Sequence, residues 1–392
     1  MQGIPAAVIP YKAGTYATIK RNLMNSIKSA AMPLVKVLGR TSKEAPYVLF
    51  WTGSRYEMDV KAANLSVVIK ASYEFHEQWI VVLCDGAPMI RMPLQKGDNV
   101  IPILRNRNPE TLHHIRIVKD TPVMPGDGDH YIELTDILSD GALYPVAERS
   151  RKLLFVGDSI TSGEGGSGAQ GEADWVPAVF SAVDNYAYML CDALDADYQV
   201  LSQSGWGVVC GYDNDVRHNM PKAWHKVCAI AHGDGPERPV RGAEEEYEFR
   251  SFEPEAVIIN LATNDGNGVG MPPFTDPETG VAFAMTKDAD GQLSKESTAV
   301  FAEKAVTFLS DIRCTYPKAK IIWCYGMLGY YMKPAILTAL RLYADCTGDE
   351  MPFYVDLPEA SGDSFGSRWH PGKPCHKRAA EVLAGILRKE KE

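Results

Sequence analysis

One short stretch constrains the fold of this 392-residue chain more than any other: the apolar run 153–156, followed at once by Gly157-Asp158-Ser159. A run this short and this apolar is typical of a buried strand in a parallel sheet. The residues after it, as far as Gly165, are small, polar and rich in glycine, so the chain can turn sharply where the strand ends. Ligands and catalytic groups collect at that end of open α/β sheets. Ser159 is therefore a candidate nucleophile.

Other interpretations of this stretch compete with catalysis. A Gly-Asp-Ser after a strand is by itself most often a turn or a helix N-cap. Residues 163–168 also match the dinucleotide pattern G-x-G-x-x-G. However, the next expected strand, 198–202, ends in Gln203-Ser204-Gly205, which offers no carboxylate for a ribose, and no Lys follows the glycines as a Walker loop requires. No nucleotide or other cofactor is predicted.

Charge and composition exclude several classes of partner. The net charge is −10 and no basic stripe occurs, which argues against nucleic acid and against an anionic membrane surface. The first ten residues carry no basic cluster before an apolar core, and no apolar run is long enough to span a bilayer. On these grounds we expect a cytoplasmic protein.

Cysteine and histidine spacing indicates neither disulfides nor a metal site. The eight cysteines are scattered, form no C-x-x-C pair and lie mostly in apolar surroundings, as buried reduced thiols do. His113 and His114 are adjacent on an expected strand, where neighbouring side chains face opposite ways, so the two cannot share one metal. No metal is predicted.

The first part of the chain, 1–150, is predicted to be an all-β domain. Residues 1–40 are weakly patterned, and 17–27 have the spacing of a short amphipathic helix. From residue 47 onward, short β-branched and aromatic segments alternate with turn signals, which is typical of a β-sandwich or a jelly roll. The expected strands are 47–51, 56–60, 65–69, 79–83 and 114–118.

The second part, 151–392, alternates strands with helices. Such alternation predicts a parallel, doubly wound α/β sheet of the flavodoxin-like kind. The predicted fold class is therefore α/β, with an amino-terminal β domain that precedes the α/β domain in the chain. The expected strands are 153–156, 198–202, 256–261, 320–325 and 353–356, and the expected helices are 185–194, 297–315, 334–344 and 376–388.

Three further groups follow strands of this sheet. Gly205 comes after the second strand, Asn264-Asp265-Gly266 after the third, and His370-Pro371 after the fifth. Each is ordinary turn or helix-start chemistry when taken alone. Together with Ser159 they supply a hydroxyl, a free N–H, an amide donor and an imidazole at one sheet edge, which is what acyl transfer requires.

These four blocks, in this order, resemble those of the SGNH (GDSL-like) hydrolases. The β-rich part directly before the Gly-Asp-Ser-Ile-Thr strand makes the chain similar to the second family of carbohydrate esterases, which remove acetyl groups from plant polysaccharides. The resemblance implies that Ser159 is the nucleophile and His370 the general base and acid. It also implies that Gly205 N–H, the Asn264 side chain and Ser159 N–H form an oxyanion hole. The implied partner is an acetylated oligo- or polysaccharide, and the implied reaction is its deacetylation.

Some alternatives stay open at this level. Many SGNH enzymes carry an acid three residues before the histidine, but here that residue is Ser367; either a backbone carbonyl or Asp363 then orients His370. Core packing is the default for Trp206 and Trp369, although an exposed ring could stack on a sugar. The rival functions are a lipid or thioester hydrolase with the same machinery and a carbohydrate-binding protein without turnover. A homo-oligomer is compatible with the sequence.

Overall fold

The computed structural model describes residues 25–26, 32–43, 47–124, 126–127, 129–231 and 242–389. Most of the helix expected over 17–27 lies outside these residues. Its described part, Asn25–Ser26, is instead a short strand, β1, that pairs with a later strand of the β domain. The helical expectation is wrong there because pairing with a distant strand overrides a weak local pattern. Among the described helices, none is both long and apolar enough to cross a membrane.

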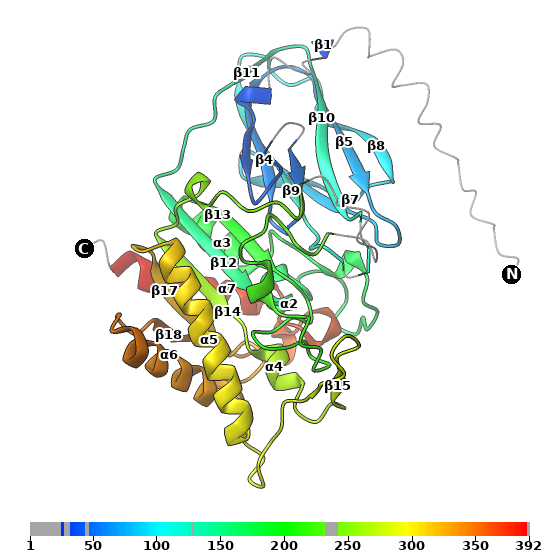
Figure 1. The fold of residues 1–392 in the computed structure, drawn as a ribbon. Coiled ribbons are helices and arrows are strands. Elements are labelled where there is room, and N and C mark those ends of the chain that lie inside the picture. The colour runs from blue at the N-terminus through cyan, green and yellow to red at the C-terminus, as the bar shows by residue number, and fades with distance from the viewer. Residues whose placement is uncertain are drawn as a thin grey trace, which may run out of the picture.

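Two antiparallel sheets occupy the upper part of the molecule in Figure 1. Alternate residues of their strands, such as Met58, Ile69 and Ile117, point between the sheets and are fully buried in one apolar core. The first sheet consists of β1, β3 (Val48–Leu49), β5 (Leu65–Ser72), β8 (Gly97–Leu104) and β10 (Tyr131–Ser139). The second consists of β2 (Lys36–Leu38), β4 (Arg55–Lys61), β6 (Trp79–Cys84), β7 (Ala87–Pro93), β9 (Leu112–Lys119) and β11 (Ala142–Tyr144).

The five strands expected in this region are present, and six further strands among the described residues, β1, β2, β7, β8, β10 and β11, were not predicted. β7 contains two prolines and is largely exposed at the edge of its sheet, where proline is tolerated. β10 carries the acidic Glu133 and Asp136 on a strand that is buried almost throughout, and its register shifts between Leu134 and Asp136. Neither strand has the alternating or uniformly apolar pattern by which strands are recognised.

A parallel sheet of five strands forms the centre of the lower part. Its order is β13-β12-β14-β17-β18, so the first strand of the unit lies between the second and the third. All four pairings are parallel, as expected from the alternation of strands and helices. The strands are β12 (Arg151–Gly157), β13 (Ala196–Ser202), β14 (Ala256–Asn260), β17 (Lys320–Tyr325) and β18 (Phe353–Asp356).

Helices cover both faces of this sheet. Leu153 and Phe155 of β12 pack with α3 and α7 residues on one face, whereas Leu154 and Val156 pack with α5 and α6 residues on the other. The helices are α2 (Ser159–Ser162), α3 (Tyr186–Leu194), α4 (Thr263–Asn267), α5 (Lys295–Thr315), α6 (Lys333–Thr347) and α7 (Lys373–Lys389). The short 3-10 helices are η1 (Met32–Leu34), η2 (Pro177–Val179), η3 (Met220–Ala223), η4 (Phe249–Ser251), η5 (Gly362–Ser364) and η6 (Ser367–Trp369), and β15 (Phe274–Thr275) pairs with β16 (Ala282–Phe283).

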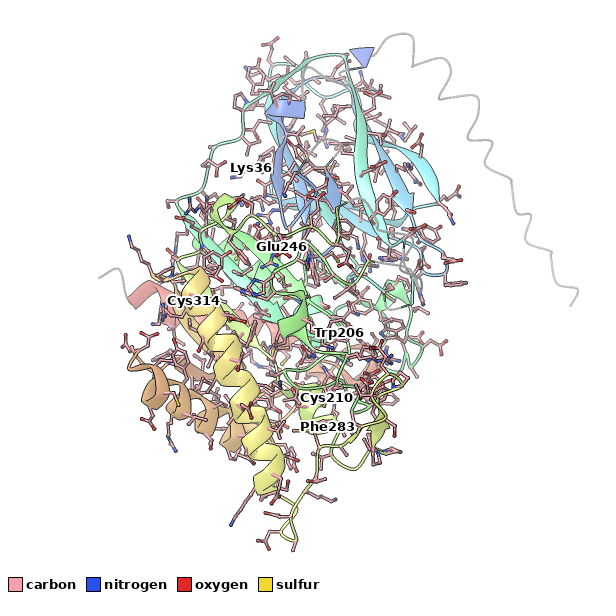
Figure 2. The ribbon with its side chains drawn as sticks, in the orientation of Figure 1. Lys36, Trp206, Cys210, Glu246, Phe283 and Cys314 are labelled. Atoms are coloured by element: carbon pink, nitrogen blue, oxygen red, sulfur yellow. The ribbon has the colours of Figure 1, made fainter. Side chains whose placement is uncertain are left out.

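The antiparallel sheets rest directly on the parallel sheet. Phe50 and Trp51, just after β3, belong to the same apolar cluster as Leu154 and Val156 of β12. Lys36 lies at this junction (Figure 2), where its ammonium is 2.7 Å from the buried carboxylate of Asp197 on β13. The two parts therefore share a core as well as ion pairs.

Candidate active site

The turn after β12 places Ser159 at the carboxyl edge of the parallel sheet. Asp158 is the N-cap of α2, and its carboxylate accepts from the Ile160 N–H at 3.0 Å. Glycine is required at 157, because a Cβ there would lie 2.0 Å from Thr161 Oγ1. Ser159 is the first residue of α2, so its own N–H has no partner within the helix.

His370 contacts Ser159 directly. Its Nε2 is 2.9 Å from Ser159 Oγ, and its Nδ1 is 2.9 Å from the backbone oxygen of Arg368. A carbonyl oxygen only accepts, so Nδ1 carries the proton and Nε2 is the free base. The Ser159 hydroxyl therefore donates to Nε2, which is the arrangement needed to deprotonate it. Of the two groups left open by the sequence, the structure places the backbone carbonyl on His370. Asp363 is exposed on η5 and makes no hydrogen bond or ion pair to His370 among the described residues.

The segment that carries this carbonyl has an uncommon backbone. Arg368 has φ 55° and ψ 30°, and Trp369 has φ 54°, so two consecutive residues other than glycine are left-handed. Each such residue costs on the order of 1–3 kcal/mol. The turn also leaves Trp369 exposed at 72%, so the expectation of core packing is wrong for this residue. Trp206 is partly buried, and its ring stacks on His218 at 5.6 Å.

A buried carboxylate that sequence reasoning missed lies behind His370. Glu164 Oε1 is 2.7 Å from Arg368 Nε and 3.7 Å from His370 Nδ1, while Oε2 accepts from the Ser204 hydroxyl at 2.9 Å. Only 2% of Glu164 is exposed. Its position within the Gly-rich loop is the one signal the sequence offered, because a charged residue is unusual among small residues in a turn.

Gly205 and Asn264 lie at the same sheet edge as Ser159. Gly157 is paired with Ser202 on one side and with Asn260 on the other, so the three turns that follow these residues are neighbours. Gly205 has φ 79°, and its N–H donates to no other described residue. The Asn264 amide donates to the Trp206 carbonyl at 2.9 Å, which leaves its second N–H available. Three N–H donors thus lie on turns that adjoin Ser159.

Asp265 holds the loop that leads away from Gly205. Its carboxylate accepts from the N–H groups of Val208 and Val209 at 2.9 and 2.7 Å, and burial raises its pKa to about 6. Figure 2 shows Trp206 and Cys210, near the two ends of this loop. Burial, with smaller contributions from Asp265 and Glu164, likewise raises the pKa of Asp158 to about 7. Both carboxylates are buried and accept hydrogen bonds from backbone N–H groups next to the site.

Residues at the start of α3 hold the turn that carries Ser159. Asn185, the N-cap of α3, donates to the carbonyls of Ile160 and Thr161 at 3.0 and 2.8 Å. Thr161 Oγ1 is 2.9 Å from the hydroxyl of Tyr186, whose ring stacks on His376 with an angle of 3° between the planes. Burial lowers the pKa of His376 to about 3, so the ring is neutral at physiological pH.

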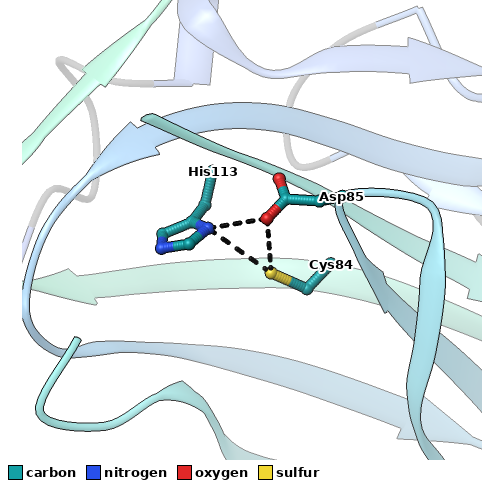
Figure 3. A group of neighbouring side chains, drawn as sticks. All are labelled: Cys84, Asp85 and His113. Atoms are coloured by element: carbon teal, nitrogen blue, oxygen red, sulfur yellow. Dashed lines mark hydrogen bonds and ion pairs between the residues drawn. The ribbon is translucent and has the colours of Figure 1, made fainter. Parts of the chain in front are cut away.

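One group of potential metal ligands occurs among the described residues, and it lies away from this site, in the β domain (Figure 3). His113 Nδ1 is 2.7 Å from Asp85 Oδ2, and the Cys84 thiol donates to the same oxygen at 3.5 Å. Burial, together with Asp85, raises the pKa of Cys84 to about 11, so the sulfur stays protonated. In this structure the three side chains are thus hydrogen-bonded to one another. His114 faces the other way, toward Asp59, as expected for neighbours on a strand.

Comparison with known proteins identifies the family. No family model matches the chain. A solved structure of a family two carbohydrate esterase from Clostridium thermocellum in complex with cellohexaose has a TM-score of 0.71 at 21% identity and covers 91% of this chain and 98% of that one. An acetyl xylan esterase, Est2A, from the rumen bacterium Butyrivibrio proteoclasticus has a TM-score of 0.90 at 36% identity, covering 94% of this chain and 98% of its own.

The chain belongs to the second family of carbohydrate esterases.

Curated relatives agree with this assignment. An acetylxylan esterase / glucomannan deacetylase from Cellvibrio japonicus is 22% identical over 377 residues, which is 94% of this chain and 92% of the relative. The cellulase/esterase CelE from Acetivibrio thermocellus is 24% identical over 344 residues, 86% of this chain. This carbohydrate esterase spans 37% of the length of CelE. The family expected from the sequence is thus confirmed.

Proposed function

We propose that this protein is a serine esterase that removes O-acetyl groups from carbohydrate, with acetylated xylan or mannan oligosaccharides as substrates. The observation that carries the proposal is the Ser159–His370 contact of 2.9 Å, with Nδ1 held on a backbone carbonyl, so that Nε2 faces the hydroxyl as a base. Family membership and the names of the relatives, an acetyl xylan esterase and an acetylxylan esterase / glucomannan deacetylase, support the substrate class.

The chemistry follows from these positions. Ser159 Oγ attacks the acetyl carbonyl carbon while His370 Nε2 takes the hydroxyl proton. The N–H groups of Ser159, Gly205 and the Asn264 side chain would stabilise the resulting oxyanion. The imidazolium then gives its proton to the departing sugar oxygen, which leaves an acetyl group on Ser159. A water molecule, deprotonated in turn by His370, attacks this acyl-enzyme, and acetate leaves as the Ser159 hydroxyl re-forms.

Exposed aromatic rings near the site suit a sugar substrate. Trp369 is 72% exposed beside His370, and Tyr212 is 52% exposed with its ring 3.1 Å from where a Gly205 Cβ would lie. The apolar face of a sugar ring packs well on such a surface. We further propose that the antiparallel sheets are jelly-roll-like and that the parallel sheet, whose strand order in chain numbering is 2-1-3-4-5, is flavodoxin-like.

The test is acetate release from acetylated xylo- and manno-oligosaccharides, with the parent protein compared with Ser159→Ala. We expect kcat/KM to fall by about 10⁴-fold or more in the variant, because the attacking oxygen is removed. Ser310→Ala, which removes a half-buried hydroxyl of α5 that donates only to the Val306 carbonyl, is the matched control and should keep full activity. Release by the parent that persists in Ser159→Ala would contradict the assignment.

Nitrophenyl esters of increasing acyl length separate the deacetylase from a lipid hydrolase. A deacetylase should lose activity steeply beyond acetyl, whereas a lipid hydrolase should gain it. A parent protein that binds the oligosaccharides but hydrolyses none of these esters would instead be a carbohydrate-binding protein.

A further inference from the structure

We infer that Glu164 is a positioning residue for both halves of the catalytic machinery, in place of the acid that many SGNH enzymes carry before the histidine. The inference rests on the proposed function, because it concerns how Ser159, His370 and Gly205 are held for acyl transfer. Glu164 itself touches none of the reacting atoms. Its carboxylate acts through Arg368 and Ser204.

Backbone contacts and burial hold Glu164 in a fixed position. It follows Gly163, the C-cap of α2, and its N–H donates to the Ser159 carbonyl at 3.0 Å. It also forms a bridge with Phe180, whose own carbonyl accepts from Arg91 of β7 at 2.7 Å. With 2% of its surface exposed, the residue has little freedom to move. The carboxylate is therefore a fixed point relative to the nucleophile.

Glu164 acts on His370 through Arg368. The Arg368 carbonyl that fixes the protonated Nδ1 lies on a left-handed backbone that local preference opposes. The Glu164–Arg368 ion pair, at 2.7 Å from Oε1 to Nε, holds this side chain, and the Arg368 N–H donates to the Glu172 carbonyl at 2.7 Å. Without the ion pair, the segment can relax toward a right-handed backbone. The carbonyl would then turn away from His370.

Glu164 also contacts the turn that carries Gly205, through Ser204. Glu164 Oε2 accepts from the Ser204 hydroxyl at 2.9 Å, and Ser204 directly precedes Gly205. One buried carboxylate thus joins the turn after β12, the turn after β13 and the segment before α7. A hydrogen bond to an ionised group is shorter and stronger than one between neutral groups, so Glu164 ties the three segments to one another.

The negative charge of Glu164 also lies close to the ring of His370. Glu164 Oε1 lies 3.7 Å from His370 Nδ1, which is too far for a hydrogen bond but close enough for electrostatic attraction. The attraction favours the imidazolium that forms during acyl transfer, and the Arg368 guanidinium offsets part of it. Removal of the carboxylate leaves the guanidinium unbalanced next to the imidazole.

The experiment compares parent, Glu164→Gln, Glu164→Ala, Arg368→Ala and the Glu164→Ala/Arg368→Ala double variant, with nitrophenyl acetate as substrate. Misplacement of reacting groups by about 1 Å costs on the order of 100-fold, so we expect Glu164→Ala to lower kcat by about that factor with KM nearly unchanged. Glu164→Gln, which keeps an acceptor oxygen for Arg368, should lose less. The exposed Asp174 lies on the same loop, and Asp174→Asn is the matched control that should keep parental kcat.

Three readouts separate positioning from general structural damage. The acid limb of the kcat/KM–pH profile should move to lower pH in Glu164→Gln, because an unbalanced positive charge opposes protonation of His370. The Nδ1–H proton resonance of His370 should broaden or vanish in Glu164→Ala, as that proton becomes open to water. The double variant should lose little more than Glu164→Ala alone, since Arg368 is held by its ion pair with Glu164.

The outcomes are decisive in each direction. Folded Glu164→Gln and Glu164→Ala proteins with parental kcat and an unchanged pH profile would overturn the inference, as would losses that multiply in the double variant. If Glu164→Ala does not fold, Glu164→Gln decides. If the parent hydrolyses no ester at all, the proposed function fails, and the Nδ1–H resonance still tests the role of Glu164 by itself.

Discussion

At the scale of single residues, a backbone oxygen orients His370, the proposed general base. The Arg368 carbonyl fixes the tautomer, and Ser159 receives the free nitrogen. A carbonyl dipole stabilises an imidazolium less than a directly bonded carboxylate does, because it carries no net charge. Asp363 is exposed on η5 and does not contact the ring, so it has no part in this arrangement.

Replacement of Asp363 provides a direct test at this scale. We expect Asp363→Ala to keep acetate release within about twofold of the parent, because surface substitutions away from a site have small effects. His370→Ala should lose about 10⁴-fold or more in kcat/KM, since the base is removed. The measurement is kcat/KM for both variants under the same conditions. A loss in Asp363→Ala as large as that in His370→Ala would show that this carboxylate reaches the ring during turnover.

At the scale of elements, α2 is a helix of only four residues that could not persist alone. Its stability comes from neighbours on three sides. Asn185 donates to the Ile160 and Thr161 carbonyls, Thr52 of the β domain donates to the Ser162 carbonyl at 3.3 Å, and the Asp158 cap holds its first turn. Each contact satisfies a backbone group that such a short helix leaves unpaired. Ser159, the proposed nucleophile, is thus held by tertiary contacts rather than by helix propensity.

Asn185→Ala should therefore cost more than the loss of an ordinary cap. The variant loses the cap of α3, worth about 1 kcal/mol, and two buried hydrogen bonds, each worth about 1 kcal/mol, so we expect the free energy of unfolding to fall by about 2–4 kcal/mol. Ser294→Ala removes only the cap of α5 and its hydroxyl contact to Thr286, and should cost about 1–2 kcal/mol. Urea unfolding measures both. Equal losses in the two variants would mean that Asn185 is no more than a cap.

At the scale of the whole molecule, the antiparallel sheets and the parallel sheet share one apolar core and buried polar contacts. Trp51 and Leu154 belong to one apolar cluster, and Arg55 of β4 donates to the Tyr198 carbonyl of β13 while lying 2.6 Å from Glu57. The Arg55 guanidinium is fully buried, so its ion pair and its hydrogen bond are both needed. Contacts from the β domain reach the site through Thr52 and Arg91. The antiparallel sheets therefore support the nucleophile turn and are not a separate appendage.

The pH dependence of global stability follows from His376. Burial lowers its pKa in the native state to about 3, whereas the unfolded chain has the usual value of about 6.5. The unfolded state therefore binds a proton that the native state does not, and stability from this group is present above pH 6.5 and falls by about 1.4 kcal/mol for each pH unit below it. His376→Asn keeps an acceptor for the Tyr186 N–H and removes the titration. The free energy of unfolding of the parent minus that of the variant should shrink between pH 6.5 and pH 5.

A difference between parent and variant that stays constant over this range would contradict the assigned cause. Because the quantity is a difference, contributions from other buried acids cancel. Those acids act with the opposite sign: burial raises the pKa of Asp158 to about 7 and that of Asp265 to about 6, so their ionisation opposes folding as the pH rises.

Local pattern was sufficient to predict the central architecture. The strands β12, β14 and β17 are short apolar runs that are buried on both faces, which makes them recognisable without any knowledge of their neighbours. Turn chemistry then placed Ser159, Gly205 and Asn264 after strands, and parallel strands bring their carboxyl ends to one edge. For this reason the family was accessible from the sequence, as was the placement of these candidate residues at one sheet edge.

What only the tertiary structure decided depends on contacts between distant residues. Glu164 meets Arg368 across 204 positions in the chain, and no local pattern marks such a pair. The carbonyl that orients His370 was one of two open alternatives, because its direction depends on left-handed backbone angles that neither Arg nor Trp favours. β7 and β10 escaped recognition because an edge position tolerates proline and buried partners tolerate acids. Periodicity determined the elements, since burial repeats along the chain, whereas long-range pairing of charge and backbone determined how the site is held.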